Sequence, residues 1–244
     1  MVKELIQNST TLDLPNGKTV KISIRRSDRA RRLKIRILPK TGQAELILPR
    51  FIEEQKGISF LKQKSNWVEN HLCKISEPIP FKDGAIVPLF DKPLNIFHVS
   101  AKGSDVRLEG KNLLVSAPKN VLSRAITAWY KREAGCEITI LAKNKSALLG
   151  KAYSRLTIRD TKSRWGSCSA SGSLNFSWRL IMAPHYVLDY MVSHEIAHLI
   201  EMNHSKNFWR IVRTLSETVD EGQSWLRQNG HNLHRYGEEI SDRV

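Results

Sequence analysis

Three histidines and a glutamate lie close together in residues 194–204, which read His-Glu-Ile-Ala-His-Leu-Ile-Glu-Met-Asn-His. On an α-helix, side chains four residues apart lie on one face, so His194 and His198 can hold one metal ion. Glu195 lies about 100° around the helix from His194, near enough to take a proton from a water molecule on that ion. We therefore predict metal ligands at His194 and His198 and a general base at Glu195. The plain alternative is two ordinary histidines on a helix.

The predicted ion is Zn²⁺, which imidazole ligands favour, and a catalytic zinc ion usually takes three protein ligands. His204 is the best candidate for the third, but on a continued helix it would lie about 240° around the axis from the second histidine of the motif. The chain must therefore turn back within residues 199–203, and Asn203 suits such a turn because asparagine tolerates the left-handed conformation. Ser205 can then cap a new helix. Glu201 is a rival third ligand.

The segment Ser163-Arg164-Trp165-Gly166-Ser167-Cys168 precedes the motif and contains two further candidates. Arg164 is a candidate substrate-binding residue, because a guanidinium can face a carboxylate or a phosphate. Cys168 is either a nucleophile or, as isolated cysteines more often are, a small buried residue. A catalytic thiol would be redundant beside a water molecule that zinc and Glu195 activate.

Two more substrate-binding candidates are Asn175 and His185. Asn175 lies in a short predicted strand, residues 173–177, which is either an edge strand that pairs with an extended peptide or a plain interior strand. His185 follows Pro184, which opens the motif helix, and is a candidate to reach the cleft. Asp189 either orients a ligand histidine or belongs to a solvated helix face. The candidate donors to an oxyanion, among which the sequence does not choose, are Tyr186, Tyr190, His231, His234 and Tyr236.

The positive charge of the chain is concentrated near its N-terminus. Residues 18–40 contain ten lysines and arginines and one acid, Asp28, so this window nets +9 of the formal +15. Arg32, Lys34 and Arg36 alternate with aliphatic residues, as in a half-buried strand. This row of cations fits either a phosphate-rich partner, nucleic acid or nucleotide, or a solvated strand face in a basic protein. No aromatic residue interleaves the cations to stack bases.

Composition and length limit the class of protein. The chain has 244 residues, of which 41% are hydrophobic and 26% are charged, as in ordinary globular domains. No segment approaches the roughly 18 apolar residues that span a bilayer, and residues 1–11 lack the apolar core of a secretory signal. Its three cysteines are too widely spaced for a Cys-x-x-Cys zinc knuckle or a disulfide framework. We therefore expect a cytoplasmic protein of a reducing compartment, with no membrane partner.

The residue pattern predicts an α+β chain that is β-rich before Pro118 and mainly helical after it, so we place two domains, at residues 1–117 and 118–244. In the first domain we expect a hairpin over residues 11–24 that turns at Asn16-Gly17, and a second strand pair at 32–38 and 43–48. We also expect one helix over residues 53–75 and several short strands within 81–117. In the second domain we expect a long helix over residues 120–149, which Gly135 can interrupt, and two short strands at residues 155–160 and 174–181.

Several motifs together resemble those of the YgjP-like metallopeptidase-domain family, a relative of the WLM and SprT-like zincins. The residues that carry the resemblance are Ser163–Cys168, Leu174-Asn175, Pro184, Asp189-Tyr190, His194–His198, Asn203–Ser205 and Phe208-Trp209. The resemblance is dense over residues 155–215. It implies a minimal zincin-like domain with an HExxH active-site helix, in which three histidines bind Zn²⁺ and Glu195 is the general base.

Three functions remain open from the sequence. The first is a zinc-dependent hydrolase, foremost a metallopeptidase, that cleaves a peptide with a zinc-bound water activated by Glu195. The second keeps the metal but takes a nucleotide or another phosphoanhydride, as a pyrophosphatase does, because the cationic window suits polyphosphate. In the third, the basic N-terminal region delivers the hydrolase to DNA or RNA, and the WLM and SprT-like relatives imply a protease acting near DNA.

Overall fold

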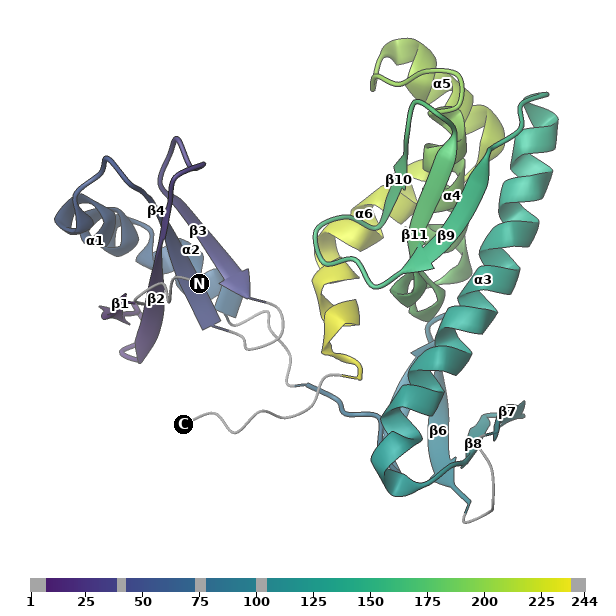
Figure 1. Ribbon diagram of the computed structural model, residues 1–244, viewed down its shortest axis with the longest axis horizontal. Helices are drawn as coiled ribbons and strands as arrows, with labels where there is room; N and C mark the ends of the chain where they lie inside the picture. Colours follow the sequence, from purple (N-terminus) through teal and green to yellow (C-terminus); the bar gives the residue numbers. More distant parts are fainter. Residues whose placement is uncertain (1–7, 39–42, 73–77, 100–104, 238–244) are drawn as a thin grey trace, which may run out of the picture. The chain divides into compact units, whose positions relative to one another are not determined.

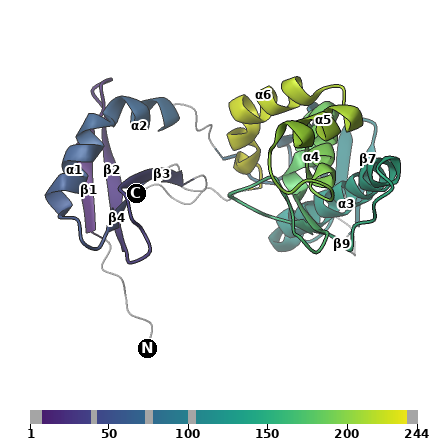
Figure 2. The same cartoon turned by 90° about the horizontal axis from the view of Figure 1, so that it is seen from above.

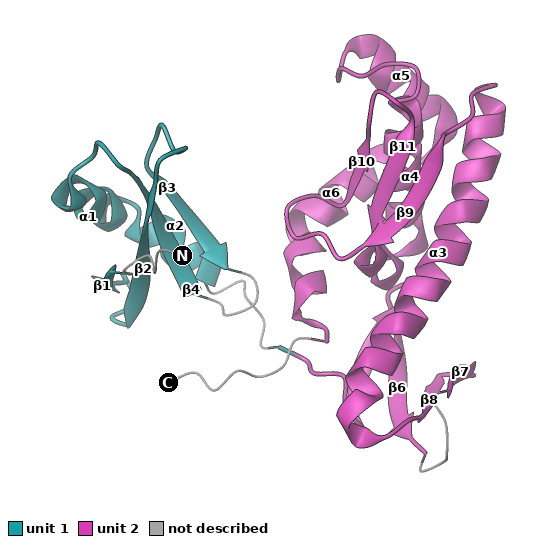
Figure 3. Ribbon diagram, viewed as in Figure 1, with its two compact units in different colours: residues 1–78, 240–244 teal, residues 79–239 magenta. Residues whose placement is uncertain are grey.

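The computed structural model describes residues 8–38, 43–72, 78–99 and 105–237. The chain divides into two compact units, Met1–Pro78 with Ile240–Val244, and Ile79–Glu239 (Figure 3). Each unit has a hydrophobic core of its own. Pro118, where the sequence predicts the change from strands to helices, lies inside the second unit. None of the described helices combines the length and the apolar character that a membrane span requires, and the expected cytoplasmic location stays a prediction.

The first unit is a four-stranded sheet with two helices. Its elements are β1 (Asn8–Asp13), β2 (Thr19–Ser27), β3 (Lys34–Leu38), β4 (Gln43–Pro49), α1 (Glu54–Gln63) and α2 (Ser65–Leu72). The strand order is β1-β2-β4-β3, in which β2 and β4 are parallel and the outer pairs are antiparallel. The predicted hairpin at Asn16-Gly17 is confirmed, with Gly17 at φ +80°. Residues 39–42, which connect the second predicted strand pair, lie outside the described residues.

The single helix predicted for residues 53–75 is instead two helices, which are separated at Lys64, and residues 73–75 lie outside the described part of the chain. Gly57 of α1 lies against the sheet, where a Cβ atom would be 3.0 Å from the side chains of both Leu46 and Leu48. Glycine therefore lets the helix approach the sheet closely.

The second unit begins with a sheet of the same topology. Its strands are β5 (Ile86–Leu89), β6 (Lys92–His98), β7 (Asp105–Glu109) and β8 (Asn112–Ser116), in the order β5-β6-β8-β7 with β6 parallel to β8. The short strands predicted within residues 81–117 are thus confirmed. Both units join two hairpins through a central parallel pair, a structural repeat that the sequence does not reveal.

A single turn of 3₁₀-helix, η1 (Lys119–Val121), leads into the long helix α3 (Leu122–Leu148), which Figure 1 shows in teal. The helix runs through Gly135 without a break, so the interruption predicted there is wrong. Gly135 lies beside the next strand, where a Cβ atom would be 3.6 Å from Cγ1 of Ile158, an ordinary van der Waals contact.

Replacing Gly135 by alanine should stabilise the protein. Alanine is favoured over glycine in a helix interior by up to about 1 kcal/mol, and the added methyl group has room beside Ile158. We expect Gly135→Ala to raise the midpoint of thermal unfolding by about 2–4 °C. A lower midpoint in calorimetry would show that α3 needs glycine for its approach to Ile158.

A three-stranded sheet follows α3. Its strands are β9 (Arg155–Arg159), β10 (Gly166–Cys168) and β11 (Ser173–Ser177), in the order β10-β11-β9. The strand predicted for residues 174–181 therefore ends at Ser177, and the segment Ser163–Cys168 contains the strand β10. Because β11 is the middle strand, the edge-strand alternative is wrong for residues 173–177, and β10 lies at an edge instead.

The last described segments are helices, of which α4 packs on this sheet. They are η2 (Trp178–Met182), α4 (His185–Ala197), α5 (Lys206–Leu215), α6 (Val219–Asn229) and η3 (Gly230–Arg235). Helix α4 contacts β10, α3, α5 and α6, whereas α3 also contacts β9 (Figures 1 and 2). The predicted α+β class is confirmed, and α4 lies at the centre of the helical layer.

Candidate metal centre and active site

The chain turns back directly after α4. The helix ends at Ala197, with His198 as its C-cap. Further on, the Ser205 N–H donates to the Asn203 carbonyl oxygen over 2.8 Å, and Ser205 Oγ accepts from the Phe208 N–H over 3.2 Å to cap α5. The predicted turn and cap are therefore confirmed. Asn203 is not among the described non-glycine residues with positive φ, so the left-handed conformation expected there is wrong.

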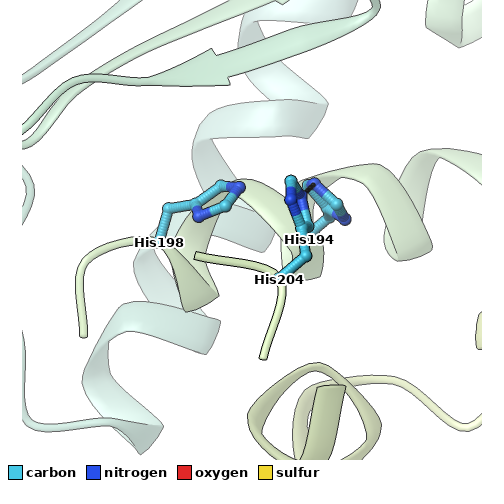
Figure 4. Close-up of side chains that lie close together, drawn as sticks. All are labelled: His194, His198 and His204. Atoms are coloured by element: carbon cyan, nitrogen blue, oxygen red, sulfur yellow. Dashed lines mark hydrogen bonds between the residues drawn. The ribbon is translucent and has the colours of Figure 1, made fainter. Parts of the chain in front are cut away.

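The turn brings three imidazole rings to one point (Figure 4). His194, His198 and His204 each offer one ring nitrogen, and these nitrogens lie within 4.8 Å of one another. His198 Nδ1 is 3.0 Å from the Glu201 carbonyl oxygen, so a proton on Nδ1 makes this contact and leaves Nε2 free for an ion. The Glu201 carboxylate instead accepts from the Asn203 N–H at 3.4 Å, and this rival ligand does not join the described cluster.

The cluster fits a divalent ion that prefers nitrogen ligands. The Nε2 atoms of His194 and His204 are 3.1 Å apart. Tetrahedral zinc at its usual bond lengths holds neighbouring nitrogens about 3.3 Å apart. One of the two nitrogens must carry a proton to make the present contact, and a metal ion would replace that proton.

The protonation states of the histidines also suit metal binding. Burial, together with the two neighbouring histidines, lowers the pKa of His194 to about 3. Burial lowers the pKa of His198 as well. Both rings are therefore neutral at pH 7, the form in which imidazole binds a metal. Their role as metal ligands stays a prediction.

Phe208 supports the three rings from α5. Its ring is fully buried, and its centroid lies 4.9, 4.5 and 4.7 Å from those of His194, His198 and His204. The Trp209 ring adds contacts with His194 and His204 at 5.8 and 6.0 Å. These aromatic side chains restrict the orientations of the histidines. In the sequence they stand out only through the family resemblance.

Glu195 lies on the same helix as the first two histidines and is 4% exposed. Burial raises the pKa of its carboxyl group to about 7, while the Arg164 charge and a hydrogen bond from the Cys168 N–H oppose this rise. A carboxylate with a pKa near the working pH can both take and give a proton. The predicted general base therefore lies in an environment that suits the role.

Gly166 explains how Glu195 fits under the edge strand β10. A Cβ atom at Gly166 would lie 2.6 Å from Glu195 Oε1 and 2.9 Å from its Cδ, closer than such atoms approach. The strand can pass over the carboxylate only because this residue has no side chain. This role of Gly166 is not among the sequence predictions, although a glycine inside Trp165-Gly166-Ser167 was the available signal.

The structure separates the three substrate-binding candidates. Arg164 precedes β10, is exposed and acts on the charge of Glu195, so it lies near the site. Asn175 pairs with Ser167, and its Nδ2 is 3.5 Å from Ser167 Oγ. Because side chains alternate along a strand and Gly166 faces Glu195, Ser167 and Asn175 face away from it. Asn175 therefore does not join the site.

His185 also lies away from the three histidines. It begins α4, and nine residues of helix place it about 14 Å from His194 along the axis. Its Nε2 is 2.8 Å from Glu137 Oε1 on α3, and its ring contacts that of Phe90 at 5.3 Å. The structure thus does not bring His185 into the cleft.

The surroundings of two other candidates, Cys168 and Asp189, do not suit the catalytic roles considered for them. Burial, with the Glu195 charge, raises the pKa of the Cys168 thiol to about 11, so the thiolate expected of a nucleophile is scarce at pH 7. Asp189 Oδ1 lies 2.6 Å from the ammonium group of Lys145, which is buried and also donates to the Leu215 carbonyl oxygen. Lys145 of α3 therefore joins α4 and α5, and Asp189, its partner on α4, neither orients a ligand histidine nor lies on a solvated face.

The candidate oxyanion donors are dispersed. The Tyr190 ring lies edge-on to His194 at 6.0 Å, whereas Tyr186 lines a hollow with Trp225. His234 is buried and stacks on Trp165 at 5.0 Å. Tyr190 therefore stands nearest to the histidine cluster by ring contact.

His234 should make stability depend on pH. Burial, with Arg179 nearby, lowers the pKa of His234 from 6.5 to about 4. The folded protein therefore binds this proton less tightly than the unfolded chain, so its contribution to stability is complete above pH 6.5 and is lost as the pH falls through 4. Between pH 7 and pH 5, the metal-free wild type should lose about 2 kcal/mol more of its unfolding free energy than His234→Gln does. Equal losses in urea titrations would contradict this.

Three imidazole rings around one point, beside a buried carboxylate, define the class of site: a candidate metal-dependent hydrolytic centre. A family model described as "YgjP-like, metallopeptidase domain" matches residues 31–229. The chain therefore belongs to the YgjP-like metallopeptidase-domain family, as the sequence motifs predict, and this family makes it a metallopeptidase.

Comparison with solved structures finds the metallopeptidase zymogen abylysin of Pyrococcus abyssi. The two sequences are 23% identical over 36% of this chain and 90% of that one, with a TM-score of 0.34. No curated protein matches the chain.

Proposed function

We propose that this protein is a zinc-dependent peptidase whose metal ligands are His194, His198 and His204 and whose general base is Glu195. The observation that carries the proposal is the convergence of the three ring nitrogens within 4.8 Å, next to a carboxyl group with a pKa of about 7. A zinc ion with three imidazole ligands acidifies water and polarises a carbonyl group.

The chain itself would supply proton transfer, stabilisation of the Glu195 charge and a place for the peptide. Glu195 takes a proton from water and returns it to the leaving amine, and its raised pKa makes both transfers possible near pH 7. The Cys168 N–H and the Arg164 charge both stabilise the ionised form of Glu195. The free edge of β10 passes beside this carboxylate and can pair with an extended peptide, as a strand added to a sheet edge does.

The experiment that tests this function needs no assumption about sequence preference. The zinc-loaded protein is incubated with a library of peptides from a digested proteome, and new termini are read by mass spectrometry. We expect cleavage inside peptides that a chelator abolishes and added zinc restores. Absence of new termini at all zinc concentrations would refute the peptidase assignment.

Cations near the site favour acidic peptides. A shallow hollow of about 530 Å³ lies on the exposed face of α5 and is lined by Lys206, Trp209, Arg210, Arg213 and Thr214. Trp209 links it to the histidines, whose rings it contacts. Arg213 is paired with Asp220, whereas the guanidinium of Arg210 bonds only the neutral side chain of Asn207 among described residues.

Reversing one charge should therefore change the peptide preference. In a pair of peptides that differ by Glu or Lys near the cleaved bond, Arg210→Glu should lower kcat/KM for the acidic peptide about 5-fold, the effect of an exposed charge pair worth about 1 kcal/mol. Lys131→Glu, the same charge change on α3, is the control and should leave the preference unaltered. If both variants changed the preference equally, the change would result from net charge alone and not from Arg210.

A nucleotide phosphoanhydride is the competing substrate, because cations also attract polyphosphate. The family match favours peptide instead. A panel of nucleoside triphosphates, assayed for release of phosphate and pyrophosphate, distinguishes the two. Turnover that needs the metal and exceeds peptide cleavage would replace the peptidase proposal with a pyrophosphatase.

A further inference from the structure

Among the described residues of the first unit, one face of the sheet carries no helix. Ile22, Ile24, Leu46 and Leu48 of β2 and β4 pack with the helices α1 and α2 in a shared core. Side chains that alternate with these residues project from the opposite face. The register pairs them in two rows across β2, β4 and β3, namely Ser23–Glu45–Arg36 and Arg25–Ile47–Lys34.

Cationic side chains cover this open face. Glu45 is 4% exposed, since it lies between Arg36 at 2.7 Å and Arg25 at 3.3 Å. Ile47 is only 9% exposed, although no helix covers it, and its neighbours in the row are Arg25 and Lys34. The aliphatic stems of these long side chains can cover the strand while their charged ends stay in water.

The loop from β2 to β3 extends the positive surface. A hollow of about 540 Å³ lies at its base, and its lining residues are Arg25, Ser27, Arg29, Ala30, Arg31, Arg32, Leu33, Lys34 and Ile47. No acid is among these residues, and Asp28 of the same loop is paired with Arg50 instead. The carboxylate in the two rows, Glu45, is already shared by two guanidinium groups. The surface therefore has a large uncompensated positive charge.

The chemistry of the surface indicates phosphate groups. Arginine presents a planar fork of donors that matches phosphate oxygens, and five of the six cations in the two rows and the hollow are arginines. No aromatic side chain lines the hollow, and Phe51, an exposed aromatic residue of the unit, is not part of it. Single-stranded nucleic acid is usually held by stacking its bases on aromatic rings. In a duplex the bases are already stacked on one another, so a protein surface of this kind contacts the phosphate groups of the backbone.

We propose that the open face of β2, β4 and β3, together with the loop residues 27–33, binds double-helical nucleic acid through its phosphates, without reading its sequence. DNA and RNA duplexes share this chemistry. The binding does not depend on the proposed peptidase activity.

The test measures fluorescence anisotropy of labelled 20-base-pair DNA and RNA duplexes, and of one single strand, with the full-length protein between 50 and 200 mM salt. We expect duplex binding that weakens steeply with salt. The triple variant Arg29→Gln, Arg31→Gln, Arg32→Gln should bind at least about 10-fold more weakly, and its slope of log affinity against log salt should be smaller by about 3. These side chains are exposed and make no described hydrogen bond or ion pair, so the unit should still fold.

A matched control removes the same charge from the second unit. The variant Arg124→Gln, Lys131→Gln, Lys143→Gln changes three exposed cations of α3 and should bind as the wild type does. Glu195→Gln should also bind normally, which separates this proposal from the hydrolytic one. Binding to either duplex supports the proposal, and the duplex that binds more tightly shows whether the ligand is DNA or RNA. Tighter binding of the single strand, salt-independent binding, or an equal loss in the control would overturn it.

Discussion

Replacing Glu195 by glutamine should lower peptide cleavage by about 1,000-fold or more, while the protein still binds one zinc ion. The amide has nearly the shape of the carboxyl group and fits the same buried place, but it cannot take a proton. The measurements are kcat/KM on a fluorogenic peptide taken from the library experiment and the zinc content of the same preparation.

Glu201→Gln is the matched control for this substitution. It makes the same chemical change three residues beyond His198, and the amide oxygen can still accept from the Asn203 N–H. We expect its activity to stay within about 2-fold of wild type, as is usual for surface changes. Activity retained in Glu195→Gln would contradict the mechanism, because no proton acceptor would then be needed at this position.

Replacing Gly166 by alanine should reduce cleavage by about 100-fold, the effect expected when a reacting group moves by about 1 Å. The new methyl group would lie 2.6 Å from Glu195 Oε1, so the carboxylate must move. The proposed metal ligands lie on α4 and on the turn before α5, and zinc content should therefore stay near one per chain. Kinetics and elemental analysis of one sample check both statements.

Two controls show whether the effect is specific to Gly166. Ser167→Ala alters the neighbouring residue, which faces away from Glu195, and Gly135→Ala adds a methyl group where there is room. Both should remain active. Normal cleavage by Gly166→Ala would mean that β10 can shift without cost, and that the fit between strand and carboxylate is unimportant.

Local signals were enough to predict much of the fold and the convergence of the three histidines. Asn16-Gly17 marks a hairpin because both residues tolerate positive φ. The spacing of His194 and His198 follows from the helical repeat, and the distance to His204 requires a turn that Ser205 ends by capping α5. Each of these inferences depends on residues within about a dozen positions of one another.

Features that depend on distant residues were not predictable in this way. β10 is only three residues long and is held by β11, so no periodicity reveals it. The face that Asn175 occupies depends on its register with Ser167. Asp189 pairs with Lys145, 44 residues earlier in the chain, and its surroundings follow from how α3 and α4 pack. Side-chain pairing across elements, rather than residue type, decides these roles.

The most direct test of the account is the metal content of the wild type and of His204→Ala, purified without added metal and again after zinc is offered. Elemental analysis should find about one zinc ion per chain in the wild type and much less in the variant, because an ion with two remaining imidazoles is held weakly. A wild type that takes up no zinc would contradict the central claim, and so would a variant that keeps it undiminished.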